Sequence, residues 1–155
     1  MTGPILTERP DDPATFRFFN EVGIIEHLAR TAQERVMPLG LSHAGFGVLN
    51  HLVRLGHVNR PPARIAMAMQ VTKGAMTGTL QRLEAQGWVM ITADPGDGRA
   101  KFVNVTPAGR AVRGLAVARL QPLFDDLTKQ ISEQELAAAM PTLEKVRKIL
   151  DAARD

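Results

Sequence analysis

The 155-residue chain contains no cysteine and no tyrosine, and aromatic residues make up only 5% of it. The absence of cysteine excludes disulfides, thiolate metal sites and thiol-based redox sensing. With so few aromatic side chains, we expect no stacking surface for single-stranded nucleic acid. The apolar runs are far shorter than a membrane span, and the N-terminus lacks the basic and then apolar run of a signal peptide. We therefore expect a cytoplasmic protein with no membrane partner.

Signals of enzymes and metal sites are also sparse. The only serines, Ser42 and Ser132, lie where helix caps belong, and neither a phosphate-binding Gly-rich loop nor a pair of catalytic carboxylates is present. The four histidines show no i, i+4 spacing that would place two metal ligands on one helical face; they are His27, His43, His51 and His57. The sequence therefore predicts no catalytic residues, no metal site, no cofactor and no enzyme.

Positive charge is concentrated in the centre of the chain. Residues 60–110 contain seven basic and three acidic side chains, whereas the flanking segments are nearly neutral. A basic patch confined to a short region is typical of a surface that neutralises DNA phosphates, because a merely solvated surface would spread its charge. The central segment is therefore the candidate nucleic-acid-binding region.

The first part of this segment predicts a short helix, a tight turn and a second, amphipathic helix. Thr72 is placed to cap the second helix, and Met76, Leu80 and Leu83 form one buried stripe at i, i+4 and i+7. The opposite face has the size and chemistry to enter a DNA major groove. Its side chains are small, polar or cationic: Lys73, Gly74, Thr77, Gly78, Gln81 and Arg82.

The second part predicts a β-hairpin. Residues 88–92 and 102–105 are rich in β-formers, and the loop 93–100 between them contains one proline and two glycines. Residues 57–60 predict one further extended step. Core positions are expected for Trp88 and for the methionines Met67, Met69, Met76 and Met90.

Long helices are predicted on both sides, over residues 12–37 and 106–152. Pro122 and Pro141 should bend or interrupt the helices of the second segment. The apolar stripes of these helices exceed what one helix-turn-helix unit can cover, so we expect a second copy of the chain to bury the surplus. Two groove-reading units on a two-fold dimer meet half-sites about 34–36 Å apart, so dimerisation also serves recognition.

Four short segments occur in a set order along the chain: VTKGAMT (71–77), RLEAQGWV (82–89), DPGDGR (94–99) and VTPAG (105–109). With the helices before and after them, they resemble the MarR family of regulators. The resemblance implies one domain over residues 1–155, mainly α with a small β-hairpin, in which a winged helix-turn-helix region (42–105) is flanked by long dimerisation helices. It also implies a homodimer that binds a pseudo-palindromic operator and usually loses DNA affinity when a small molecule binds.

The same resemblance assigns roles to individual residues. Arg99 would enter the minor groove with Asp97 holding its guanidinium. Apart from the resemblance, Lys101 is a candidate DNA contact because of its place on the hairpin; the alternative for Lys73, Arg82 and Lys101 is a solvated surface charge. An arginine fits the negative potential of a narrow minor groove, and a neighbouring carboxylate can fix its planar fork. Gly78 departs from the pattern, because many members carry a long or basic side chain there. The recognition helix would present Thr72, Lys73, Gly74, Thr77, Gln81 and Arg82.

A candidate effector pocket combines His51 with Phe16 and Phe46; the alternative interpretation of His51 is a hydrogen-bonded core histidine. The sequence predicts a regulator that binds double-stranded DNA sequence-specifically, as a repressor released by a small-molecule effector. Two alternatives are a winged-helix protein-interaction module without DNA binding and a metal-sensing regulator.

Overall fold

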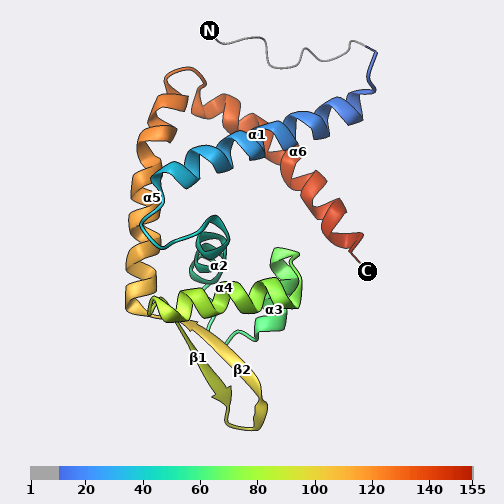
Figure 1. Ribbon diagram of the computed structural model, residues 1–155. Coiled ribbons are helices and arrows are strands. Elements are labelled where there is room, and N and C mark those ends of the chain that lie inside the picture. The colour runs from blue at the N-terminus through green and yellow to red at the C-terminus, as the bar shows by residue number, and fades with distance from the viewer. Residues whose placement is uncertain (1–10, 155) are drawn as a thin grey trace. The chain divides into compact units, whose positions relative to one another are not determined.

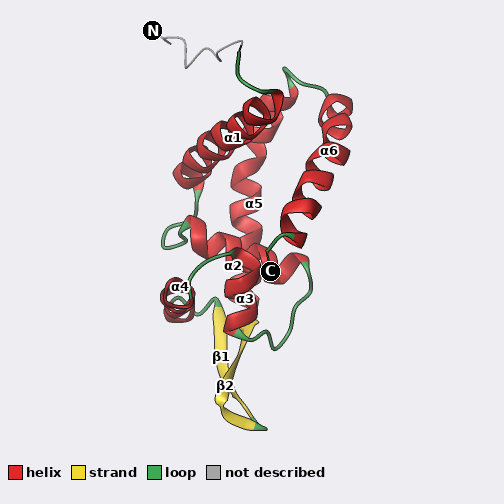
Figure 2. Cartoon of the chain, turned by 90° about the vertical axis from the view of Figure 1, so that its right-hand side faces the viewer, coloured by secondary structure: helices red, strands yellow, loops and turns green. Residues whose placement is uncertain are grey.

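The computed structural model describes residues 11–154. Over this range the chain is helical apart from a two-stranded antiparallel hairpin, as Figure 2 shows, so the predicted fold class of a mainly α protein with a small β-hairpin is confirmed. The elements in chain order (Figure 1) are α1 (Ala14–Val36), α2 (His43–Arg54), α3 (Pro62–Met69), α4 (Lys73–Ala85), β1 (Val89–Asp94), β2 (Asp97–Val105), α5 (Pro107–Thr128) and α6 (Glu133–Ala152).

The chain divides into two compact units, one up to Ala116 and one from Val117 onward. The first unit contains α1 to α4, the hairpin and the start of α5, and the second contains the rest of α5 and α6. The predicted DNA-binding region, 42–105, lies wholly in the first unit. The assignment of residues 1–155 to one domain stays a prediction.

The core of the first unit is built by α2, α3, α4 and the base of the hairpin. α2 begins as predicted, since the Oγ of Ser42 accepts a hydrogen bond from the amide of Gly45 at 3.0 Å. α2 then contributes its apolar face to the core, and α3 and β2 add side chains that are fully buried. The largest fully buried side chains are Val48, Leu49, Leu52, Ile65 and Val103.

The hairpin is tighter than its predicted loop. The strands pair in antiparallel register from Val89 opposite Val105 to Asp94 opposite Asp97. The prediction of a loop over residues 93–100 is therefore wrong, and the chain reverses at Pro95 and Gly96. The carboxylate of Asp94 accepts from the amide of Gly96 at 2.8 Å, a local turn that closes the chain quickly. Residues 98–100 lie between two successive pairs of the register as a bulge in β2.

The extended step predicted at residues 57–60 is confirmed at its last residue. Arg60 pairs with Val103 of β2, with backbone hydrogen bonds of 3.1 and 2.9 Å. Beside this pair, the side chain of Asn104 makes two bonds to Asn59: its Nδ2 donates to Oδ1 of Asn59, and its Oδ1 accepts from the backbone amide of Asn59, both at 2.8 Å. The hairpin is therefore anchored to the segment that precedes α3.

Two of the predicted core methionines lie at the surface. Met76 is 2% exposed, but Met67 is 62% exposed and Met90 is 54% exposed, so the prediction was wrong for both. Met67 follows the buried Ile65 by two residues, which places it on the opposite side of α3, and Met90 alternates with the buried Val89 along β1. Met69 and Trp88 are partly buried against the core, as expected.

The prolines of the second unit do not break its helices. α5 continues past Pro122 to Thr128, and α6 continues past Pro141 to Ala152, so the predicted interruption is wrong. A proline removes one backbone donor, and the hydrogen bonds of the turns on both sides are sufficient to continue the helix. α6 begins with the predicted capping box, in which Ser132 and Glu135 each accept from the other's amide.

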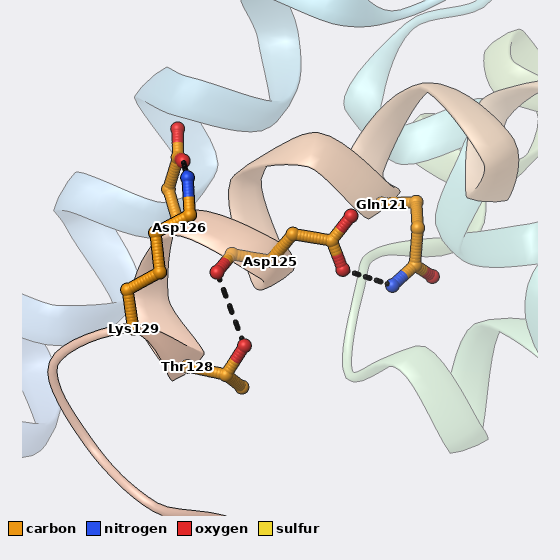
Figure 3. A network of polar contacts seen from close by, with 5 residues as sticks. All are labelled: Gln121, Asp125, Asp126, Thr128 and Lys129. Atoms are coloured by element: carbon orange, nitrogen blue, oxygen red, sulfur yellow. Dashed lines mark hydrogen bonds and ion pairs between the residues drawn. The ribbon is translucent and has the colours of Figure 1, made fainter.

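Short-range polar contacts lie at the C-terminal end of α5, as Figure 3 shows. Nε2 of Gln121 donates to the carboxylate of Asp125 at 2.8 Å, and the hydroxyl of Thr128 donates to the carbonyl of Asp125 at 3.1 Å. Lys129 forms an exposed ion pair with Asp126 at 2.6 Å. Exposed ion pairs contribute little to stability, so these contacts define where the helix ends more than they hold the unit together.

The terminal helices carry the surplus apolar surface that the sequence predicts. Over their described lengths, α1 and α6 contain no buried residue. On α1 the exposed side chains include Val22, Ile25 and Leu28, with Ile25 at 61%. On α6 they include Leu136, Met140, Leu143 and Leu150. In a single chain, therefore, both stripes are open.

Candidate nucleic-acid interface

Residues that the sequence analysis identifies cap the start of α4 and set which of its faces is buried. The hydroxyl of Thr72 accepts from the amide of Ala75 at 3.1 Å, which satisfies one of the free amides at the helix start. The turn before it is made by Gln70 in the left-handed conformation, at φ 51°. The predicted buried stripe is confirmed, because Met76, Leu80 and Leu83 are at most 3% exposed. α4 is therefore fixed in rotation, with one face on the core.

The opposite face of α4 is open to solvent. All six residues predicted on the recognition helix are exposed: Thr72, Lys73, Gly74, Thr77, Gln81 and Arg82. The hydroxyl of Thr77 donates to the carbonyl of Lys73 at 2.9 Å, which leaves its oxygen lone pairs outward as acceptors. The structure thus gathers these side chains on one solvent-facing surface, and their contact with DNA stays a prediction.

Arg99 lies in the bulge next to the hairpin turn and is exposed. The carboxylate of Asp97 accepts from the backbone amide of Arg99 at 3.0 Å, so Asp97 holds the main chain at this point. The predicted contact between Asp97 and the guanidinium of Arg99 stays a prediction. Lys101, also exposed, pairs with Ala93 on the last regular rung before the bulge.

Glu84 joins α4 to the hairpin, a role that the sequence analysis missed. Its carboxylate accepts from the backbone amide of Ile91 on β1 at 3.1 Å. Beside this contact lies a hollow of about 280 Å³, which is also lined by Thr77, Gln81 and Lys101. Glu84 belongs to the RLEAQGWV segment, so that segment was the available signal. The bond sets the position of the hairpin relative to α4.

Replacement of Glu84 by alanine is expected to loosen β1 against α4, because the amide of Ile91 loses its acceptor. We expect its hydrogen exchange to accelerate roughly three- to tenfold, as for the loss of one modest hydrogen bond. The matched control is Glu84→Gln, which keeps an acceptor oxygen and should keep most of the protection. Equal exchange rates for Ile91 in the wild type and in Glu84→Ala would contradict this role.

A second pairing fixes the start of α5 against α2 in the first unit. Nε and Nη2 of Arg113 both donate to Oδ1 of Asn50, at 3.2 and 2.8 Å. The two residues are 63 positions apart, and no local pattern announces the pair. This contact positions the start of α5 on α2, and it can be identified only from the folded structure.

The residues of the predicted effector pocket occupy different surroundings. Phe46 packs on the core, whereas Phe16 is 59% exposed in the first turn of α1. α1 rises about 1.5 Å per residue, so its first turn is about 30 Å from the end that leads to α2. His51 lies against His57, with ring centroids 5.3 Å apart. The grouping of Phe16, Phe46 and His51 stays a prediction.

The Nε2 atom of His51 bears on the alternative interpretation as a hydrogen-bonded core histidine, which stays a prediction. This nitrogen is buried and has no hydrogen-bond partner among the described residues. Burial lowers the pKa of His51, and the nearby His57, Arg54 and Arg60 lower it further. Cationic neighbours and burial both disfavour a charged ring. His51 is therefore held in its neutral form.

Residues 11–154 contain neither a metal-ligand cluster nor a membrane-spanning helix. Within this range, no three His, Asp or Glu side chains are grouped so that they could hold a metal ion. Over the same range, the helices are all too short or too polar to cross a membrane.

The arrangement in the first unit defines a class of protein. A short helix and a solvent-facing second helix are joined by a tight turn, and a hairpin anchored at Arg60 and Glu84 follows them. This is a winged helix-turn-helix, in which α4 is the recognition helix and the hairpin is the wing.

Comparisons with known proteins agree with this class. Residues 39–100 match the model of the MarR family. The multiple antibiotic resistance protein MarR of Escherichia coli K12 is 29% identical over 142 residues, which are 86% of this chain and 97% of that protein. Its counterpart in Salmonella typhimurium is 28% identical over the same lengths. A crystal structure of a mutant E. coli MarR with operator DNA is 28% identical with a TM-score of 0.64, and the match covers 86% of this chain and 99% of that one.

The chain is therefore similar to the MarR family of winged helix-turn-helix transcriptional regulators, by a family model over residues 39–100 and by relatives that align with 86% of its length. Members of this family are transcriptional regulators and not enzymes.

Proposed function

We propose that this regulator binds double-stranded DNA sequence-specifically as a homodimer and represses transcription until a small molecule releases it. One observation carries the proposal: α4 presents a solvent-facing row of polar and cationic side chains, and the wing presents Arg99 beside its turn. A helix of this kind fits the major groove, and an arginine on a narrow projection fits the minor groove. DNA as the ligand is also supported by the operator-bound structure of the E. coli relative.

The charge of the surface supports the same ligand. The cations Lys73, Arg82, Arg99 and Lys101 are all exposed on α4 and the wing. The carboxylates on the same elements are engaged with backbone amides: Glu84 with Ile91, Asp94 with Gly96 and Asp97 with Arg99. The carboxylates thus position the main chain while the cations stay open to phosphates.

The dimer is supported by the uncovered apolar side chains of α1 and α6. Burial of this surface against a second copy would stabilise the assembly at about 25 cal/mol per Å² of apolar area. A two-fold dimer presents two recognition helices, so its operator would be pseudo-palindromic, with half-sites about 34–36 Å apart. A regulator that acts on chromosomal DNA works in the cytoplasm.

Release by an effector rests on less, namely the family and the candidate wall formed by Phe46 and His51. A histidine ring whose pKa is lowered by burial suits an uncharged or aromatic portion of a small molecule. Two alternatives remain. A protein-interaction module would not need the cations of α4 and the wing to be free of carboxylate partners, so their exposure favours DNA binding. A metal sensor would require a ligand cluster, and residues 11–154 hold none.

The experiment that tests the proposal measures the affinity of Arg99→Ala for promoter DNA. We expect a rise in Kd of at least about fivefold, equal to about 1 kcal/mol, because each protomer loses its minor-groove cation. Lys129→Ala is the matched control, since it removes the same charge from the exposed turn after α5. Specific binding that is unchanged by Arg99→Ala would overturn the assigned surface.

A further inference from the structure

Gly78 lies in the middle of the recognition helix, with Arg82 one turn later. A Cβ placed on Gly78 would meet Nη1 of Arg82 at 3.4 Å. The guanidinium of Arg82 therefore folds back over the glycine, which leaves room for it. This direction is the normal one, since long side chains of a helix lean towards its N-terminus.

Thr79 holds the guanidinium from the side. The hydroxyl of Thr79 donates to the carbonyl of Ala75 at 3.1 Å and accepts from Nη2 of Arg82 at 3.4 Å. Thr79 itself is only 6% exposed, so its position is set by the core. The bond to Nη2 is long, and it orients Arg82 while most of the five donors of the guanidinium stay available.

We propose that Gly78, Thr79 and Arg82 act as one specificity-determining unit, in which the missing side chain at 78 lets Arg82 read a guanine in the major groove. The inference rests on the proposed function. Lys73 lies in the first turn of α4, whereas the guanidinium of Arg82 lies beside Gly78, halfway along the helix. A recognition helix lies in the major groove, and an arginine fork matches O6 and N7 of guanine there.

The size of the residue at 78 then controls where Arg82 lies. The Cβ of Gly78→Ala would only touch Nη1, at 3.4 Å, and would raise helix propensity by about 1 kcal/mol. The side chain of Gly78→Gln would extend into the volume that the guanidinium occupies, because residues at i and i+4 share one face. The glutamine variant should therefore displace Arg82 without altering it.

The experiment begins with selection of bound sequences from a library of duplexes with a randomised core. Kd is then measured for duplexes that carry each base-pair substitution in the selected site. For the wild type we expect one G·C pair per half-site whose replacement weakens binding about 5- to 150-fold, as for a bidentate arginine contact. In Arg82→Ala the preference for G·C at this position should disappear, so that the ratio of Kd values is about one, while the preferences at other positions persist.

The other variants test the unit. Gly78→Gln should lose the preference at the same base pair as Arg82→Ala, and Gly78→Ala should lose less of it. Thr79→Val should reduce the preference because it removes the acceptor hydroxyl, and Thr79→Ser should restore it. Circular dichroism melting of each variant shows whether it is folded.

Three results would overturn the inference. Arg82→Ala could weaken binding equally to all duplexes, which would make Arg82 a phosphate contact. Gly78→Gln could leave the preference unchanged, or Gly78→Ala could lose as much as Gly78→Gln. A wild type that enriches no sequence would instead overturn the proposed function, and the inference with it.

Discussion

Gly109→Ala is expected to destabilise the protein by about 3 kcal/mol or more and to lower its melting temperature by about 10 °C. A Cβ on Gly109 would overlap the carbonyl oxygen of Trp88 and would lie 2.9 Å from Cγ1 of Val105. The oxygen belongs to the backbone, so no side-chain rotation can relieve the overlap. The start of α5 would have to move away from the hairpin.

The carbonyl oxygen of Trp88 already accepts a hydrogen bond, which increases the expected loss of stability in Gly109→Ala. The carbonyl of Trp88 accepts from the amide of Thr106 at 3.1 Å, and the hydroxyl of Thr106 donates to the carbonyl of Gly87 at 2.6 Å. The hydroxyl oxygen also accepts from the amide of Gly109 at 3.0 Å, which starts α5. Displacement of Gly109 therefore disturbs the end of α4, the start of β1 and the start of α5 together.

Gly114→Ala on the same helix is the matched control. A Cβ there meets nothing within 4 Å, so the alanine should stabilise the helix by up to about 1 kcal/mol. Both variants are compared with the wild type by thermal unfolding at one protein concentration, because the stability of a dimer depends on concentration. If Gly109→Ala melted within about 2 °C of the wild type, the close approach of α5 to Trp88 would be disproved.

The affinity for DNA is expected to fall about 10³-fold or more between about 50 and 200 mM salt. Each protomer exposes four cations on α4 and the wing, and a dimer would carry them twice. Each phosphate that a cation neutralises releases counterions and contributes about −0.9 to the slope of log K against log salt. With Arg82 on a base edge, Lys73, Arg99 and Lys101 of the two protomers leave six cations near phosphates, and six such contacts produce a fall of this size.

Lys73→Ala should make that slope shallower by about 2, since it removes one phosphate contact from each protomer. The loss should be uniform over DNA sequences, in contrast with the base-specific loss expected for Arg82→Ala. Lys129→Ala should leave the slope unchanged, because its cation lies outside α4 and the wing. Affinity that is insensitive to salt would favour the alternative of a protein-interaction module.

The sequence predicted the features of this fold that short-range physics determines. Helix caps at Ser42, Thr72 and Ser132 depend on residues three apart, and all three are confirmed. The buried stripe of α4 depends on the period of one helix. The hairpin follows from β-rich segments on both sides of a proline and glycine turn. In each case the interaction partners lie within a few residues of one another, so a local pattern contains them.

The wrong predictions also concern local interactions, but ones that leave a less distinct pattern in the sequence. The turn at Pro95 and Gly96 was overlooked because the glycine-rich segment 93–100 resembles a loop, and the side chain of Asp94 closes the turn instead. Pro122 was given too much weight, since a long helix tolerates one missing donor. Met67 and Met90 were placed by residue type rather than by their side of α3 and β1.

The sequence by itself determined the elements, their caps and the face of α4 that carries Lys73, Gln81 and Arg82. Only the tertiary structure decided how that face is positioned. Gly109 against Trp88 and Arg113 with Asn50 join segments that are far apart in the chain, and Glu84 bonds to Ile91 between the consecutive elements α4 and β1. The contact at Gly109 depends on packing between elements, because the carbonyl oxygen of Trp88 occupies the space that a Cβ would need. The guanidinium over Gly78 depends on the buried Thr79, so it too follows from the packed helix rather than from spacing alone.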